Sequence, residues 1–173
     1  AAYVYFSLFN NKRDYVMRDA YLGPDYTNEY IKNFLDENNI KYSKLKDDKE
    51  LVTSVAKLIY SNNVVGWVQK GMEFGPRALG ARSILSNPCN KKMQDILNLK
   101  VKHREKFRPF APVICLEDVK DYFEADKNVP LAADFMLLVY PIKKEKRKLI
   151  PAVTHVDGTG RLQVIRREQN TRY

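Results

Sequence analysis

The chain has 173 residues, and its 30 lysines and arginines against 21 aspartates and glutamates give a net charge of +9 at pH 7. This length fits one domain with at most a short appendage, and it is short for two full domains. An aromatic content of 12 % argues against a disordered chain, and no apolar run approaches the ~20 residues that span a bilayer.

Helices are expected in four places along the chain. Thr27 can cap a helix that runs to about residue 38. Asp47 or Asp48 can start a second helix, because Leu51, Val55 and Leu58 recur at helical spacing. Shorter helices are expected at 90–100 and 118–123.

Strands are expected between and after these helices. Residues 64–68 form a short apolar run that is typical of a buried strand, with Val65 and Trp67 in the core. Further strands are predicted at 83–85, 110–116, 135–140, 153–156 and 161–165, and the stripe of Phe135, Leu137 and Val139 is expected to be core. A hairpin signal at 157–160 separates the last two strands. The irregular order of elements predicts an α+β or α/β fold with a mixed sheet.

Cys89 and Cys115 match no metal-ligand spacing, and only His103 and His155 accompany them, so no metal site is expected. Two cysteines form no disulfide framework, which favours a reducing, cytoplasmic location. The first ten residues show no signal-peptide pattern. The chain starts without Met, and both ends look cut, so we expect a piece of a longer protein; a processed mature chain is the alternative.

Most of the positive charge lies between residues 70 and 108, a segment that contains ten lysines and arginines and only three acids. Such a segment attracts a polyanion: a nucleotide, a phosphorylated metabolite or a nucleic-acid backbone. The alternative is a solvated basic face, to which Lys91 and Lys92 are assigned.

Two arginines in this segment lie beside rigid residues. Arg77 follows Gly75 and Pro76, and Arg108 precedes Pro109. Glycine permits unusual backbone angles and proline fixes φ, so both arginines can be presented in a defined direction. A fixed guanidinium can bind phosphate through two hydrogen bonds. The alternative is that these arginines pair with Glu73 or Glu105.

Four segments resemble, in order, the carbamoyltransferase family, which includes nodulation-factor and antibiotic O-carbamoyltransferases. They are residues 66–84 (GWVQKGMEFGPRALGARSI), 98–112 (NLKVKHREKFRPFAP), 135–138 (FMLL) and 150–163 (IPAVTHVDGTGRLQ). The resemblance covers about 64–173 and is looser before that. Lys70, Ala81 and His103 depart from residues that are common in the family, and His103 adjoins an expected phosphate ligand.

The resemblance implies a two-domain enzyme of which this chain is the C-terminal part. Residues 1–20 would be the tail of a preceding ASKHA-like domain or a linker, and 21–173 a YrdC-like domain with a twisted mixed β-sheet flanked by helices. This domain would form carbamoyl-adenylate from carbamoyl phosphate and ATP with Mg²⁺, and the metal-bearing N-terminal domain would transfer the carbamoyl group to an acceptor hydroxyl. The family's Asn-Thr-Ser-Phe-Asn and Gly-Glu-Pro segments do not appear before residue 173, so part of the nucleotide site is expected to be missing.

Site residues follow from the matching motifs. The resemblance implies that Lys102 and Arg108 are catalytic and bind the phosphates, and that Arg77 and Arg161 bind phosphate with them. Residues that would support these ligands are Arg82, Arg104, His155 and Asp157.

Each assignment has an alternative. Lys102 could be a surface lysine, and Arg82 and Arg104 could be structural partners of Glu73 and Glu105. His155 could be a core histidine, and Asp157 is favoured as a turn residue over a metal ligand.

Two other functions remain open at this level: a basic concave module that binds double-stranded RNA or a nucleotide without catalysis, and a regulatory domain that has lost catalysis. A nucleic-acid binder should spread its cations over an open face, whereas an enzyme should converge Arg77, Lys102 and Arg108 on a pocket. The glycines and prolines beside these arginines favour convergence. Small-molecule substrates are therefore expected, and membrane or nucleic-acid partners are not.

Overall fold

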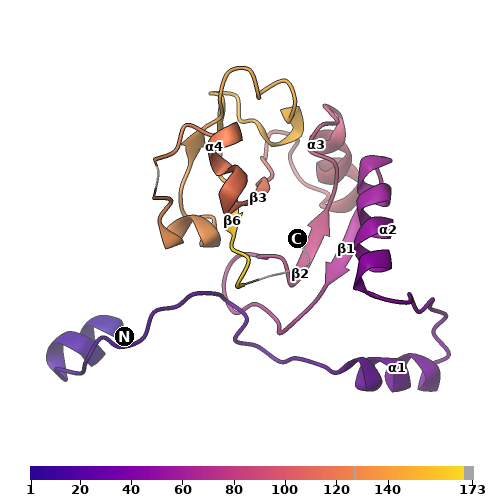
Figure 1. The fold of residues 1–173 in the computed structure, drawn as a ribbon, viewed down its shortest axis with the longest axis horizontal. Helices are drawn as coiled ribbons and strands as arrows, with labels where there is room; N and C mark the ends of the chain where they lie inside the picture. The colour runs from indigo at the N-terminus through magenta and orange to yellow at the C-terminus, as the bar shows by residue number, and fades with distance from the viewer. Residues whose placement is uncertain (127, 170–173) are drawn as a thin grey trace.

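The computed structural model describes residues 1–126 and 128–169. Figure 1 shows a rounded body with an N-terminal region that runs along one side of it. At the start of that region, the short π-helix η1 (Val4–Leu8) lies away from the body and has no buried residue. In the described part of the chain, no helix is long and apolar enough to cross a membrane.

The two predicted N-terminal helices are confirmed, and their caps are the predicted ones. Helix α1 (Asn28–Glu37) begins where the Thr27 side chain accepts a hydrogen bond from the Tyr30 amide at 3.1 Å. Helix α2 (Asp48–Tyr60) begins where Asp47 accepts one from the Glu50 amide at 2.8 Å. These side chains satisfy amides that the first helical turn leaves unpaired.

Helix α2 leads into an antiparallel pair of strands, β1 (Val65–Val68) and β2 (Arg82–Leu85). Both strands were predicted, and Trp67 of β1 is buried with 8 % of its surface exposed, as expected. Val65 is only half-buried. In Figure 1, α2 lies alongside this pair. The long connection between the strands, 69–81, carries Arg77.

After β2 the chain forms a helical segment made of α3 (Met93–Ile96) and η2 (Leu97–Val101), close to the predicted helix at 90–100. Strand β3 (Val113–Cys115) is shorter than predicted, and η3 (Leu116–Asp118) and α4 (Val119–Tyr122) match the predicted helix at 118–123. Strand β6 (Gln163–Ile165) pairs in parallel with β3. Strands β4 (Tyr140–Pro141) and β5 (Thr159–Gly160) pair antiparallel.

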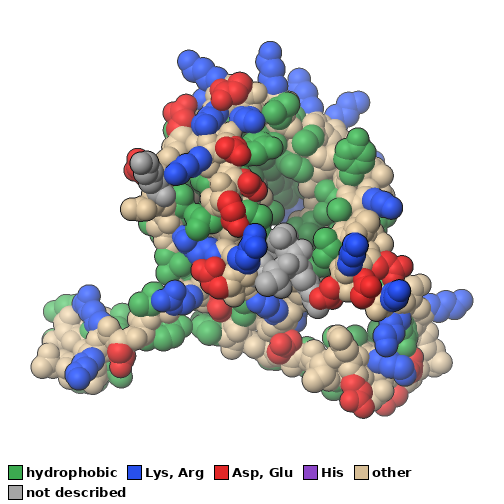
Figure 2. Space-filling view, in the orientation of Figure 1, with side chains coloured by type: hydrophobic (Ala, Val, Ile, Leu, Met, Phe, Trp, Pro, Cys, Tyr) green, Lys and Arg blue, Asp and Glu red, His purple; other side chains and the backbone are tan. Residues whose placement is uncertain are grey.

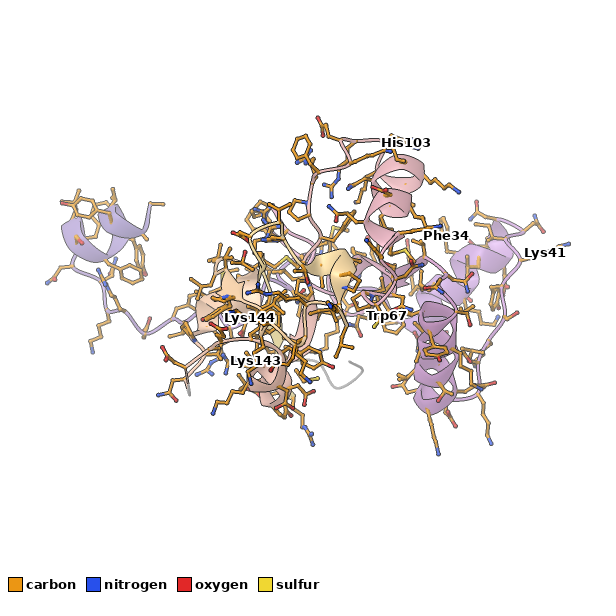
Figure 3. The ribbon with its side chains drawn as sticks, turned by 90° about the horizontal axis from the view of Figure 1, so that it is seen from above. Phe34, Lys41, Trp67, His103, Lys143 and Lys144 are labelled. Carbon is orange, nitrogen blue, oxygen red and sulfur yellow. The ribbon has the colours of Figure 1, made fainter. Side chains whose placement is uncertain are left out.

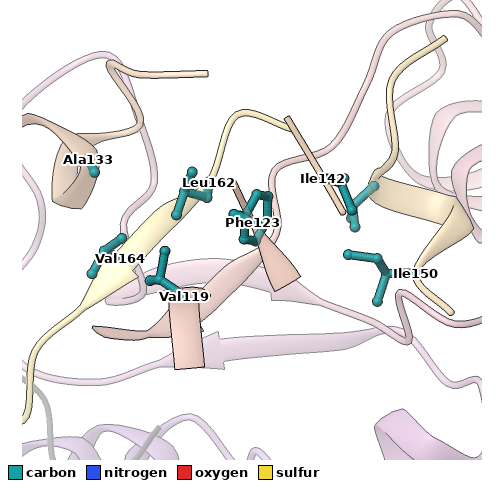
Figure 4. Close-up of a cluster of buried hydrophobic side chains, with 8 residues drawn as sticks. Val119, Phe123, Ala133, Ile142, Ile150, Leu162 and Val164 are labelled. Carbon is teal, nitrogen blue, oxygen red and sulfur yellow. The ribbon is translucent and has the colours of Figure 1, made fainter. Parts of the chain in front are cut away.

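The main core lies in this second half of the chain (Figure 4). Leu162 and Val164 reach it from β6 and its approach, and Val119 and Phe123 reach it from α4 and its end. Its buried members are Val119, Phe123, Ala133, Ile142, Ile150, Val153, Leu162 and Val164. Burial of side chains of this size supplies most of the stabilisation of a small domain.

The prediction of one mixed sheet is wrong. The described residues form three separate two-stranded sheets, of which only β3–β6 is parallel. The fold is a mixed arrangement of short strands and helices, in agreement with the α+β class.

The strand predicted at 135–140 is also wrong. Phe135 ends the 3₁₀-helix η4 (Leu131–Phe135), and Met136 adopts a left-handed φ of 56°, which interrupts an extended run. Leu137 and Val139 are exposed to 68 % and 53 %, so they are not core residues. Only Tyr140 enters a strand.

The strand predicted at 153–156 is replaced by the 3₁₀-helix η5 (Pro151–Val153). The Thr154 hydroxyl donates to the Ile150 carbonyl at 2.9 Å, and the His155 amide donates to the Thr159 carbonyl at 2.8 Å. These bonds close a local turn over the predicted hairpin signal. The strand after that turn, β5, pairs with β4 instead of with 153–156.

Candidate functional site

The connection that carries Arg77 is held at its base by one carboxylate. Glu73 Oε1 accepts hydrogen bonds from the amides of Leu79 at 2.9 Å, Ala81 at 2.7 Å and Arg82 at 3.1 Å. Desolvation raises the pKa of Glu73, but the hydrogen bonds from backbone amides outweigh it and leave this pKa below the ordinary value. The carboxylate therefore stays ionised at neutral pH and gathers the loop around itself.

The same loop is attached to the C-terminal half of the chain through the Leu79 carbonyl. That oxygen accepts a hydrogen bond from Gln163 Nε2 at 2.9 Å and another from the Tyr21 hydroxyl at 3.0 Å. Leu79 and Gln163 are both buried. The loop of Arg77 is thereby fixed beside the start of β6, two residues after Arg161.

The structure places Arg77 close enough to Arg161 for its charge to act on it. Arg161 is half-buried, and desolvation together with the positive charge of Arg77 lowers its pKa. An arginine stays protonated even so. Within residues 1–126 and 128–169, neither guanidinium forms an ion pair with an acid. Two neighbouring cations without an acidic partner can bind an anion with several oxygens.

Lys102 and Arg108 lie on a second loop, which follows η2. Buried Asn98 shapes this loop: its amide nitrogen donates to the carbonyls of Lys106 at 3.1 Å and Arg108 at 2.9 Å. Lys102 and Arg108 are exposed, and Arg108 makes a long ion pair of 3.8 Å with Glu105. His103, between them, has a left-handed φ of 48° and lies at the edge of the molecule in Figure 3.

No hydrogen bond or ion pair among the described residues joins this second loop to Arg77 or Arg161. The structure therefore brings together two of the four predicted phosphate ligands and does not link the other two to them.

The structural pairing predicted for Arg82 with Glu73 is present, though through the backbone amide, whereas the pairing predicted for Arg104 with Glu105 is wrong. Arg82 meets Glu73 through its backbone amide, while its guanidinium donates to the carbonyls of Gln69, Lys70 and Ala81. Arg104 does not pair with Glu105. Its Nε donates to Asn98 Oδ1 at 2.7 Å, and its guanidinium lies 4.8 Å from the centre of the Phe110 ring. The Arg82 guanidinium therefore holds backbone carbonyls in place, and the Arg104 guanidinium holds the Asn98 side chain.

His155 and Asp157 lie together in the turn before β5. Asp157 accepts hydrogen bonds from the Thr159 amide at 2.9 Å and hydroxyl at 2.7 Å, and the amide and hydroxyl bonds lower its pKa. His155 Nδ1 lies 3.0 Å from the same hydroxyl. These contacts are those of a turn. Among the described residues, no group of three or more His, Cys, Asp or Glu side chains could hold a metal ion.

Two features were missed from the sequence. One is an apolar cavity of about 610 Å³, visible as a hollow in Figure 2, whose walls come from α2, β1, β2, α3 and β3. Trp67, Met93 and Phe110 line it, and none of the eight predicted site residues does. The amphipathic pattern of α2 was the sequence signal for this cavity. In the structure no residue of α2 is buried, and the helix forms one wall of the cavity.

The other is an ion pair in which Nε of half-buried Arg166 lies 2.8 Å from the carboxylate of buried Asp134. Gln169 Nε2 donates to the same carboxylate at 2.9 Å and to the Arg18 carbonyl at 2.7 Å. The end of the described chain is thereby attached to residues 18–21, close to the loop of Arg77.

Comparison with known proteins agrees with this arrangement of motifs. A family model described as "Carbamoyltransferase C-terminus" matches residues 56–173. An uncharacterized protein of Synechocystis is 41 % identical over 178 residues, which cover 91 % of this chain and 28 % of that protein. The nodulation protein NolO of Bradyrhizobium diazoefficiens is 38 % identical over 158 residues, 90 % of this chain and 28 % of its own.

Nodulation protein U of Rhizobium tropici is 44 % identical over 117 residues, 67 % of this chain and 19 % of its own. The chain thus spans less than a third of the length of these relatives. The match over most of its length, through both loops that carry the predicted cations, shows that the chain belongs to the carbamoyltransferase C-terminus family.

Proposed function

We propose that this chain is the part of an ATP-dependent carbamoyltransferase that makes carbamoyl-adenylate from carbamoyl phosphate and ATP. In this proposal residues 21–173 are a YrdC-like domain, residues 1–20 belong to a preceding domain or linker, and an ASKHA-like domain transfers the carbamoyl group to an acceptor hydroxyl. Family membership supports the reaction class. The observation that carries the proposal is that the hydrogen bond from Gln163 to Leu79 holds the loop of Arg77 beside the segment of Arg161, close enough for the charge of Arg77 to act on Arg161. Neither arginine has an acidic ion-pair partner among the described residues.

The reaction asks the protein mainly for placement and charge. Water splits carbamoyl phosphate into carbamate and inorganic phosphate. A carbamate oxygen then attacks the α-phosphorus of ATP, and pyrophosphate leaves. Arg77 and Arg161 would bind phosphate oxygens and hold the reacting groups in line. Lys102 and Arg108, on their exposed loop, would bind the remaining phosphates. Mg²⁺ would be expected to accompany ATP, but the described residues offer no cluster of three ligands for it.

The exposed second loop favours one other candidate. Lys102, Lys106 and Arg108 lie on the surface beside Phe107, which is 80 % exposed. A basic loop with an aromatic tip can bind the phosphates of double-stranded RNA or a nucleotide without catalysis. Binding of an RNA duplex in the absence of any adenylate product would support this candidate.

The direct test is mass spectrometry of the full-length protein incubated with ATP and carbamoyl phosphate. We expect carbamoyl-adenylate in the parent and its loss in the Arg161→Ala variant. Lys144→Ala is the matched control, since it removes an exposed cation from the turn after β4 (Figure 3) that is not among the predicted phosphate ligands. Absence of the adduct in the parent, or parental amounts in Arg161→Ala, would contradict the proposal.

A further inference from the structure

The loop between β1 and β2 has a base held by several hydrogen bonds and an exposed tip. At the base, Gln69 Nε2 donates to the Gly80 carbonyl at 2.9 Å and the Gly80 amide donates to Ser83 at 3.0 Å, beside the three amide bonds to Glu73. Leu79, Gly80 and Ala81 are buried. The tip, residues 74–78, is exposed throughout.

Among the described residues, no atom packs against the tip at Gly75. A Cβ placed on Gly75 would meet no atom within 4 Å, and the φ of Gly75 is +150°, which glycine adopts most readily. Pro76 then fixes the backbone just before Arg77. The Phe74 amide donates to the Ala20 carbonyl at 2.7 Å, so the tip is held at its start. The direction of Arg77 therefore depends on where residues 73, 74 and 79 are held.

Glu73 is the side chain that fixes both ends of this tip. It directly precedes the tip, and its side chain accepts a hydrogen bond from the amide of Leu79, which directly follows the tip. A single oxygen, Oε1, accepts all three amides, and hydrogen bonds to a carboxylate are about twice as strong as neutral ones. Loss of this oxygen would free the amides of Leu79, Ala81 and Arg82 from residue 73 and would leave the packing of the core cluster unchanged.

We propose that Glu73 is a positioning residue for phosphate binding: it directs Arg77 toward Arg161 without touching the substrate. The inference rests on the proposed function, because it assumes that Arg77 and Arg161 bind the same anion. The placement of the Gly-Pro-Arg segment would then depend on the Glu73 carboxylate, although that carboxylate would itself repel phosphate.

Two variants of the full-length protein test this inference. Glu73→Ala removes the acceptor, whereas Glu73→Gln keeps an oxygen in place and loses the charge. We expect Glu73→Ala to raise the Kd for Mg-ATP by about tenfold or more and Glu73→Gln to raise it by less. Glu50→Ala is the control. The Glu50 carboxylate also accepts a hydrogen bond from a backbone amide, that of Lys46 at 2.7 Å, but Glu50 lies in α2, outside the loop.

Amide hydrogen exchange separates local release from general unfolding. In Glu73→Ala the amides of Leu79, Ala81 and Arg82 should exchange faster, and those of Leu162 and Val164 in the core should not. If Glu73→Ala does not fold, the same two readouts apply to Glu73→Gln, with smaller changes expected.

The outcomes are distinguishable from failure of the proposed function. A parent protein that binds neither Mg-ATP nor carbamoyl phosphate would overturn the function, and the exchange rates would still decide whether Glu73 holds the loop. Unchanged exchange at the three amides, or parental Kd with faster exchange, would overturn the inference on Glu73 alone.

Discussion

Gln163 donates a hydrogen bond from Nε2 to the carbonyl oxygen of Leu79 at 2.9 Å, across 84 positions of the sequence. Both residues are buried, and each lies two residues from an arginine of the proposed site. A buried amide must find a partner, so this bond holds the two segments in register. It is the contact that makes neighbours of Arg77 and Arg161.

The second loop yields a prediction about catalysis. Lys102→Ala and Arg108→Ala should abolish adenylate formation while leaving the free energy of unfolding unchanged, because both side chains are exposed. Each lost phosphate contact should cost about 1.5–3 kcal/mol in binding, and more in the transition state. Product analysis and denaturant unfolding check the two halves of this prediction. Parental turnover in both variants would remove these residues from the site.

Asn98 should control the shape of that loop. Asn98→Ala leaves the carbonyls of Lys106 and Arg108 without their side-chain donor, and the cost should be about 1–3 kcal/mol of stability. Asn98→Asp should be worse, since a carboxylate would face those two carbonyls. Chemical denaturation of the two variants measures this order, and an Asn98→Asp protein as stable as the parent would contradict it.

Trp67 should be a residue of stability and not of binding. It is 8 % exposed and lines the apolar cavity behind β1. Truncation to Ala should cost roughly 3–5 kcal/mol of unfolding free energy. Thermal unfolding is the measurement, with exposed Val68→Ala on the same strand as control. A Trp67→Ala protein of full stability would show that the cavity wall does not depend on the indole.

Binding of Mg-ATP to the 173-residue chain should be weak and should fall steeply as salt is added. Arg77, Lys102 and Arg108 are all exposed, and solvent and salt screen charges in that position. Calorimetry at two salt concentrations tests this. Tight, salt-insensitive binding would mean that an enclosed phosphate site exists within the chain.

The sequence predicted local structure well where one side chain determines it. Thr27 and Asp47 cap their helices as expected, and the apolar run around Trp67 is a strand. It failed at 135–140, because the apolar pattern says nothing of the left-handed turn at Met136 or of the ion pair that holds Asp134. Pairing of strands across long stretches is a tertiary property, so the three small sheets could not be foreseen.

In the candidate site, too, the sequence indicated local features but not the contacts between distant segments. The Gly-Pro-Arg motif indicated a fixed arginine, but the contact of Gln163 with Leu79, which holds its loop beside the segment of Arg161, is made between distant parts of the chain. Likewise the true contacts of Arg82 and Arg104 are backbone groups and an amide, which charge counting cannot identify.

The central claim is that Arg77 and Arg161 bind one anion together, and a double-mutant cycle on Mg-ATP and carbamoyl phosphate binding tests it most directly. Arg77→Ala and Arg161→Met should each raise Kd by about tenfold or more, and the double variant should lose less than the sum of the two, because residues that share a partner are not additive. Arg161→Met should keep the parental stability, since it removes a half-buried cation with no ion-pair partner among the described residues. Parental Kd in both single variants, or losses that add fully in the double variant, would contradict a shared anion site.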